Sequence, residues 1–177
     1  MKLDYFPVNG GDTVAVLGTH MGNEVIHYSE VVGFSGRVVA VEPNLRNFSV
    51  LMDRVKDKPN ITPLNVAVWD RNCKLNLSIG TNTTNHSLVK NWGGKTEEVD
   101  ALTWDSLMGK VGRVTLANVD VEGAENHFLR GMNINLPKHI ILEVHTFFGV
   151  DRVEVARELT RKGYGIVNES QYIYATR

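Results

Sequence analysis

Two features of the sequence could together hold a nucleoside: a turn bounded by glycines and an acidic residue further along the chain. Gly18 and Gly22 bound the turn Gly18-Thr19-His20-Met21-Gly22, and glycine permits a positive φ and a close approach of backbone to ligand. On its own, such a turn is a plain connection between a strand and a helix about as often as it is part of a binding site. Glu42 ends the next apolar run, where a carboxylate accepts hydrogen bonds from ribose hydroxyls. Together they predict a nucleoside site.

Acidic and imidazole side chains also gather at the ends of two later apolar runs. Asp120 and Glu122 lie at and just beyond the end of one run, and Glu143 and His145 end the next. Such groups are costly to bury unless they bind protons, cations or a ligand. They could supply a general base, or Asp120, Glu122 and His145 could hold a divalent cation. Taken singly, each of these residues is about as often one that only hydrogen-bonds a neighbouring loop as one with a role in catalysis or binding.

The elements that must position these residues are short apolar runs that alternate with amphipathic segments. This alternation predicts an α/β fold with a doubly wound, mostly parallel sheet. Strands are expected at Thr13–Leu17, Arg37–Val41, Ile61–Val68, Lys74–Ile79, Arg113–Asp120 and Lys138–His145. Helices are expected after Gly22, after Pro43-Asn44, at Trp104–Met108, from Ala124 and at Arg152–Lys162. At the C-terminus, Tyr164–Val167 and Gln171–Ala175 predict a hairpin whose last strand is antiparallel.

Composition narrows the class of protein. The chain has 177 residues, of which 42% are hydrophobic and 22% charged, which fits a single domain over residues 1–177. Its net charge is −1, so we expect no nucleic-acid partner. No apolar run approaches the ~18 residues that span a bilayer, and no signal-peptide region is evident, so we expect a cytoplasmic protein without a membrane partner. The single cysteine, Cys73, excludes an internal disulfide.

The glycine pattern separates two adenosine cofactors. A dinucleotide requires G-x-G-x-x-G, in which a middle glycine admits the pyrophosphate. Thr19-His20-Met21 contains no such glycine, which disfavours a nicotinamide oxidoreductase. The expected C-terminal hairpin is the arrangement that class I methyltransferases add to a doubly wound, Rossmann-like sheet. The residues therefore favour S-adenosylmethionine.

Five blocks of the sequence resemble, in order, the FkbM family of S-adenosylmethionine-dependent methyltransferases. They are GDTVAVLGTHMG at 11–22, GRVVAVEPN at 36–44, NVAVWD at 65–70, NVDVEGAE at 118–125 and ILEVH at 141–145. The resemblance implies methyl transfer from S-adenosylmethionine to a hydroxyl oxygen of a small-molecule or glycosidic acceptor. The alternative is a degenerate, non-catalytic domain that binds S-adenosylmethionine or another nucleoside.

The resemblance also implies roles for individual residues. The cofactor-binding residues would be Gly18, His20, Gly22, Glu42, Pro43, Asn44, Ala67 and Asp70. The catalytic residues would be Asp120, Glu122 and His145, with His145, or Asp120 acting with it, as the base and without a resident metal. The chain departs from the family at Val16, where the family has an acid beside the methionine moiety, and at His20, where it has Asn. Both departures put the affinity for the cofactor in question.

A polar segment at Gly80–Thr96 is a candidate lid, because a long loop without secondary structure often has a function. The segment could equally be a surface loop without a function. Within it, His86 is a candidate contact to the acceptor. Little of the chain before Thr13 could cover the acceptor, so this segment, a second copy of the chain in a homo-oligomer or a further domain is expected to close the site.

Overall fold

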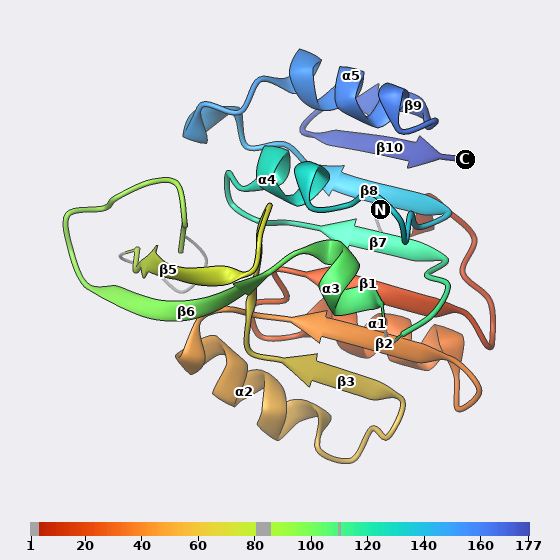
Figure 1. The fold of residues 1–177 in the computed structure, drawn as a ribbon. Helices are drawn as coiled ribbons and strands as arrows, with labels where there is room; N and C mark the ends of the chain where they lie inside the picture. The colour runs from red at the N-terminus through yellow and green to blue at the C-terminus, as the bar shows by residue number, and fades with distance from the viewer. Residues whose placement is uncertain (1–3, 81–85, 110) are drawn as a thin grey trace.

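The main sheet has seven strands and a single antiparallel member between parallel ones. The computed structural model describes residues 4–80, 86–109 and 111–177. The strand order is β3 (Ile61–Leu64), β2 (Arg37–Val41), β1 (Thr13–Leu17), β7 (Leu116–Val119), β8 (His139–Glu143), β10 (Tyr172–Thr176) and β9 (Gly165–Glu169). β10 runs antiparallel to both of its neighbours, and the other pairs are parallel (Figure 1). The predicted fold class is confirmed.

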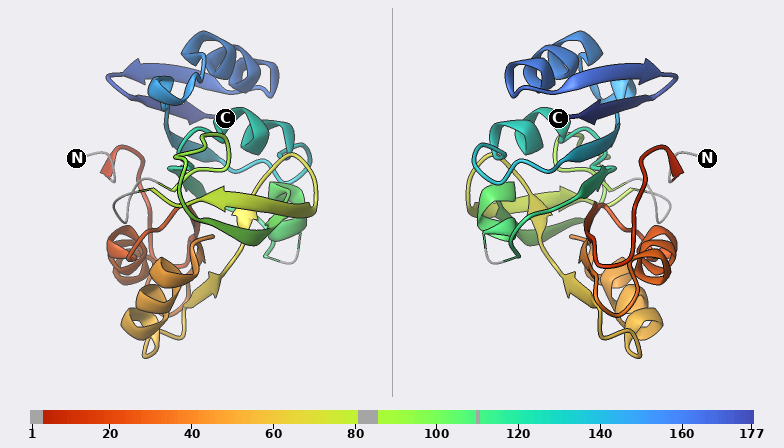
Figure 2. Two further views of the ribbon diagram at one scale, coloured as in Figure 1. Left: turned by 90° about the vertical axis from the view of Figure 1, so that its left-hand side faces the viewer. Right: turned by 90° about the vertical axis from the view of Figure 1, so that its right-hand side faces the viewer.

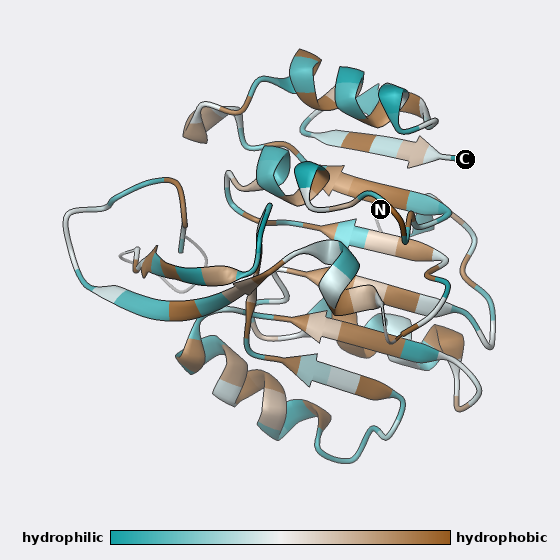
Figure 3. Ribbon diagram, viewed as in Figure 1, coloured by the Kyte–Doolittle hydropathy of each residue, from teal (hydrophilic) through white to brown (hydrophobic). Residues whose placement is uncertain are grey.

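Helices cover both faces of this sheet. They are α1 (Asn23–Val32), α2 (Leu45–Val55), α3 (Trp104–Met108), α4 (Glu125–Arg130), α5 (Arg152–Arg161) and a 3-10 turn, η2 (Thr146–Phe148). Along β1, Val14 and Val16 pack with side chains of α1 and α2, whereas Ala15 and Leu17 pack with side chains of α3, α4 and α5. Because both faces are buried, the central strands are almost continuously hydrophobic, as Figure 3 shows.

A second, three-stranded sheet lies beside the first (Figure 2). Its order is β4 (Ala67–Val68), β6 (Thr96–Leu102) and β5 (Cys73–Ser78). The prediction of one strand over Ile61–Val68 was wrong, since the segment divides between the two sheets. At the division, the Asn65 side chain donates hydrogen bonds of 2.9 Å to the carbonyl oxygens of Glu42 and Pro43. These bonds hold the point at which the chain leaves the main sheet.

In the part of the chain that the structure describes, none of the helices has both the length and the apolar character that a membrane crossing requires.

Candidate functional site

A cavity of about 270 Å³ lies at the carboxyl ends of the central strands. Gly18, Glu42 and Asp120 belong to its lining, and each comes directly after one of β1, β2 and β7. In the sheet β1 lies between β2 and β7, so the strand order reverses here. Open parallel sheets bind their ligands at such a point.

The two glycines of the turn after β1 have different tasks. Gly18 has a φ of +78°, and a Cβ at this position would overlap the carbonyl oxygen of Asp120. Any larger residue would therefore separate the ends of β1 and β7. Gly22 has a φ of +84°, and a Cβ there would overlap Cδ1 of Leu51. Gly22 thus allows α1 to pack on α2, and it is not among the described residues that line the cavity.

Glu42 is the buried acid of the cavity. Its Oε2 accepts a 2.8 Å hydrogen bond from the backbone N–H of His20, and its Oε1 accepts one of 3.0 Å from the N–H of Asn44. The residue is 4% exposed. Burial raises the pKa of Glu42 to about 7, against the lowering effect of the hydrogen bonds from Asn44 and His20. A carboxylate oxygen has two lone pairs, so both oxygens can also accept ligand hydroxyls.

Two residues of the cavity wall have an uncommon backbone conformation. His20 has a φ of +50° and Glu122 one of +47°, in the left-handed region that side chains other than glycine seldom adopt. Both line the cavity. Such conformations are found where the surrounding structure enforces them, often at binding sites. The pKa of His20 is lowered by burial.

The other residues that the resemblance assigned to the cofactor divide into two groups. Pro43 and Ala67 line the cavity. Asn44 does not appear in the described lining; it caps α2 by accepting a 3.0 Å hydrogen bond from the N–H of Asn47 and donates one of 3.0 Å to Glu97. Its contribution to the site is its backbone N–H, which binds Glu42.

Asp70 has a structural partner. Its Oδ2 lies 2.6 Å from Nδ1 of His127 in α4, and the His127 ring stacks on Trp69 with ring centroids 3.5 Å apart. Asp70 is not among the described lining residues. The pair ties the end of β4 to α4, and the assignment of Asp70 to the cofactor stays a prediction.

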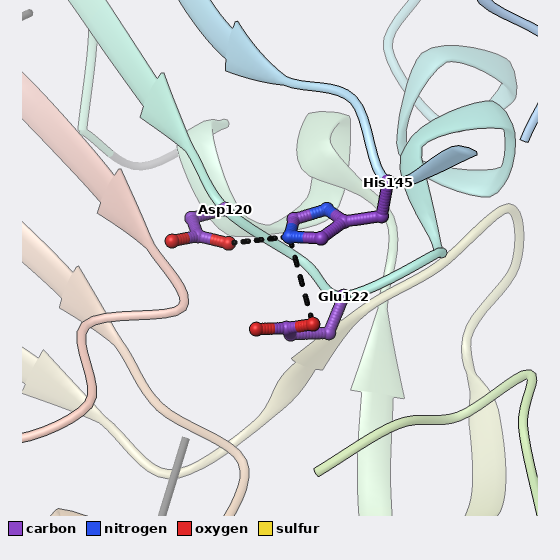
Figure 4. Close-up of side chains that lie close together, drawn as sticks. All are labelled: Asp120, Glu122 and His145. Atoms are coloured by element: carbon purple, nitrogen blue, oxygen red, sulfur yellow. Dashed lines mark ion pairs between the residues drawn. The ribbon is translucent and has the colours of Figure 1, made fainter. Parts of the chain in front are cut away.

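Asp120, Glu122 and His145 converge at the ends of β7 and β8 (Figure 4). Nε2 of His145 lies 3.4 Å from Asp120 Oδ1 and 3.5 Å from Glu122 Oε2. Its other ring nitrogen, Nδ1, lies 2.6 Å from Oε1 of Glu125, which is 0% exposed. Glu143 approaches Nε2 to 3.9 Å. We call these five residues the acidic cluster.

The charges in the acidic cluster shift two pKa values. Burial lowers the pKa of His145, but the hydrogen bond and charge of Glu125, with the charges of Asp120 and Glu122, raise it to about 9. Burial raises the pKa of Glu122 to about 7; His145 opposes this shift, while Asp120 and Glu143 add to it. At neutral pH the imidazole of His145 is therefore protonated and offsets part of the negative charge around it.

Three members of the acidic cluster could also hold a metal. Asp120, Glu122 and His145 each offer one ligand atom, and these atoms all lie within 4.8 Å of one another. Two carboxylates and one imidazole suit a divalent ion such as Mn²⁺ or Mg²⁺.

Part of the candidate lid packs over the turn after β7. Residues 81–85 lie outside the described residues. Ser87 Oγ donates a 2.8 Å hydrogen bond to the carbonyl oxygen of Glu122. A Cβ on Gly123 would lie 2.5 Å from Cγ2 of Val89, so glycine allows the segment to lie directly on the turn. This segment therefore forms a wall beside the acidic cluster.

Sequence reasoning missed several residues of the site. Leu77 of β5 and Glu24 of α1 line the cavity, and Glu125 binds His145. His86, expected near the acceptor, also lines the cavity. Glu24 and Glu125 each lie in the first turn of a helix, where acidic residues are common because they interact favourably with the helix dipole. An acid at these positions therefore did not by itself indicate a functional site.

Comparison with known proteins gives a family and similar folds. The family described as "Methyltransferase FkbM domain" matches residues 17–166. A relative from Thermococcus onnurineus, a fibrillarin-like rRNA/tRNA 2′-O-methyltransferase, is 37% identical over 62 residues, which are 35% of this chain and 27% of that protein. A relative of the same name from Pyrococcus abyssi is 34% identical over the same shares of each chain. This chain thus spans about a quarter of the length of these relatives.

Two solved structures share the fold. An FkbM methyltransferase from Methylobacillus flagellatus KT has a TM-score of 0.68 at 15% identity, with 97% of this chain and 45% of that chain covered. Fibrillarin from Aeropyrum pernix, solved with natively bound S-adenosyl-L-methionine, has a TM-score of 0.63 at 18% identity, with 97% of this chain and 69% of that one covered. At these identities the likeness concerns the fold alone, and that fold is the predicted doubly wound, Rossmann-like arrangement.

The exclusion of nucleic acid as a partner was wrong. It relied on a net charge of −1, whereas the matching relatives are named as rRNA/tRNA methyltransferases. Net charge averages over the whole surface and does not describe the field at one cleft. It therefore could not exclude a nucleic-acid acceptor.

The family prediction itself is confirmed. The matched residues 17–166 are well over half of the chain and include the turn after β1, Glu42 and the acidic cluster. The chain belongs to the FkbM methyltransferase family.

Proposed function

We propose that this chain is an S-adenosylmethionine-dependent O-methyltransferase that acts on an alcohol hydroxyl. The observation that carries the proposal is the placement of Glu42 and Asp120 in one cavity, on either side of Gly18. Glu42 would accept hydrogen bonds from the ribose hydroxyls of the cofactor, and Gly18 would let the cofactor lie against the backbone. Asp120 would then face the reacting group.

The residues in the cavity fit an adenosine cofactor. Glu42 is buried and already oriented by two backbone N–H groups, so it needs no rearrangement to receive hydroxyl donors. Pro43 and Ala67 offer small apolar surface beside it. When bound, S-adenosylmethionine supplies a methyl group on a positively charged sulfur, which is a good leaving group.

The protein's own residues must orient the acceptor and take its proton. As the bond between the acceptor oxygen and the methyl carbon forms, the bond from that carbon to sulfur breaks, and the hydroxyl proton must leave. Asp120 is our candidate for the group that receives it, because His145 is protonated at neutral pH. His145, held by Glu125, would orient the Asp120 carboxylate. This assignment moves the role of base from His145 to Asp120.

The acceptor is proposed by its chemistry, an alcohol on a sugar ring. The resemblance implies a small or glycosidic hydroxyl, and the names of the relatives point to a ribose 2′-hydroxyl of RNA. Both present the same reacting group to Asp120.

Two measurements test the proposal. Calorimetric titrations with S-adenosylmethionine, S-adenosylhomocysteine and NAD in parallel should show binding of the first two and not of NAD. Single-turnover transfer of a labelled methyl group is then measured with a short RNA and with a simple glycoside as acceptors, alongside Asp120→Asn, which should transfer roughly 10²-fold more slowly. Binding without transfer to any hydroxyl would favour a non-catalytic domain, and binding of NAD alone would contradict the proposal.

A further inference from the structure

A buried amide in the main sheet holds a carboxylate at the cavity wall. Asn118 lies in β7 and is 2% exposed. Its Nδ2 donates a hydrogen bond to Oε2 of Glu24, which lies in the first turn of α1 and lines the cavity. A buried amide requires a partner, and here the partner is a carboxylate. The pair therefore fixes the direction of the Glu24 side chain.

Glu24 and Glu42 lie on opposite sides of the turn after β1. Glu42 follows β2, on one side of β1, whereas Asn118 belongs to β7, on the other side, and is the register partner of Val16. A ligand whose ribose binds Glu42 must therefore pass Gly18 to reach Glu24. For such a ligand, the second carboxylate would lie beside the part that is furthest from the nucleoside.

The described lining of the cavity has more acidic than basic side chains. Its lining contains the carboxylates of Glu24, Glu42, Asp120 and Glu122, and neither Lys nor Arg occurs among the lining residues that the structure describes. Asp120 and Glu122 face His145, and Glu42 accepts two backbone N–H groups. S-adenosylmethionine carries an ammonium, a positively charged sulfur and one carboxylate, so its net charge is positive. An acidic wall complements it.

We propose that Glu24, oriented by Asn118, receives the ammonium of the cofactor's methionine moiety. The assignment rests on the proposed function and names a residue that the sequence analysis did not single out. Helix α1 begins at Asn23, and its N-cap residue, Gly22, has no side chain to cap the first-turn N–H groups. These groups lie next to Glu24 and suit the carboxylate of the same amino-acid moiety. The two ends of one zwitterion would thus meet opposite charges within one helical turn.

The test compares two ligands that differ only in the amino-acid part. S-adenosylhomocysteine has the ammonium, and 5′-methylthioadenosine has the same nucleoside and sulfur without it. Both are titrated by calorimetry into the wild type, Glu24→Gln and Glu30→Gln. Glu30 is a matched control because it lies on the same helix, is exposed and pairs with Lys58 at 3.5 Å, outside the cavity lining.

We expect Glu24→Gln to weaken S-adenosylhomocysteine roughly 10- to 100-fold, since a charge-assisted hydrogen bond is lost, and to leave 5′-methylthioadenosine unchanged within about twofold. Asn118→Ala, which removes the positioning residue, should produce a smaller loss with the same preference between ligands. Glu30→Gln should change neither ligand.

Equal weakening of both ligands by Glu24→Gln, or no weakening of S-adenosylhomocysteine, would overturn the assignment alone. A wild type that binds neither ligand would overturn the proposed function and the assignment with it.

Discussion

The carboxylate of Glu125 lies 2.6 Å from Nδ1 of His145 and thereby turns Nε2 toward Asp120 and Glu122. Glu125 is fully buried, so the pair is well shielded from water. A carboxylate on one ring nitrogen fixes the orientation of an imidazole and the role of the other nitrogen. Glu125 thus orients the imidazole of His145 within the acidic cluster, although Glu125 is not among the described residues that line the cavity.

The first prediction concerns the proton acceptor. We expect Asp120→Asn to lower single-turnover methyl transfer by roughly 10²-fold or more, because the amide cannot take the proton. His145→Ala should also lower turnover, through loss of the group that orients Asp120. The affinity for S-adenosylhomocysteine should change much less. Glu98→Gln, an exposed change on β6, serves as the control.

Retained turnover in Asp120→Asn and His145→Ala would show that neither side chain takes part in the reaction. The same assay with a chelator separates the two roles of the acidic cluster. We expect turnover to persist; loss on chelation and recovery with Mg²⁺ would assign Asp120, Glu122 and His145 to a metal site.

The second prediction concerns the contact between Gly18 and Asp120. Gly18→Ala combines a positive φ with overlap of the Asp120 carbonyl oxygen. Gly149→Ala is the matched control, because Gly149 has a φ of +84° and a ψ of 12°, in the left-handed region, and no atom lies within 4 Å of the added Cβ. The control should lose about 1–2 kcal/mol of unfolding free energy from backbone strain alone, and Gly18→Ala should lose clearly more. The measurement is urea unfolding; equal losses would mean that the two strand ends separate freely.

The third prediction concerns the pH dependence of stability. Glu42 has a pKa of about 7 in the folded chain, against a reference value of 4.5. Between these values the folded state binds the extra proton, so the unfolding free energy falls as pH rises through this range and levels off above it. The loss is at most roughly 3 kcal/mol. Glu42→Gln cannot ionise, so its stability relative to the wild type should rise from pH 5 to pH 8 in urea unfolding. Parallel curves for the two proteins would contradict the raised pKa.

The sequence was sufficient to predict most of the main sheet, because strands buried on both faces are continuous apolar runs, as at Arg37–Val41. It could not predict the division of Ile61–Val68. The bonds from Asn65 to the carbonyl oxygens of Glu42 and Pro43 join residues more than twenty positions apart, and no local pattern records them.

Contacts between residues that are far apart in the sequence also limited how much of the candidate site could be predicted. The positions of Gly18 and Glu42 in the cavity lining were predictable, because each directly follows a strand of the parallel sheet. Asp70 and Gly22 are not in the described lining; Asp70 contacts His127 and Gly22 allows two helices to pack, so their assignment to the cofactor stays a prediction. The place of Glu24 in the cavity wall could not be predicted from the sequence, because its side chain is oriented by Asn118, which lies 94 residues further along the chain.

The last prediction joins Val16 to Glu24. The resemblance implies an acid at position 16, but Val16 is 1% exposed and belongs to the apolar cluster around α1. Val16→Asp should therefore lower the thermal midpoint of the unliganded protein, because burying a carboxylate costs several kcal/mol. If Glu24 already supplies the negative charge, Val16→Asp should add little affinity for S-adenosylhomocysteine in the wild type and should partly restore it in Glu24→Gln. The measurement is a double-mutant cycle by calorimetry. The same gain in both backgrounds would mean that the two positions act independently, and that Glu24 does not replace the family's acid in this chain.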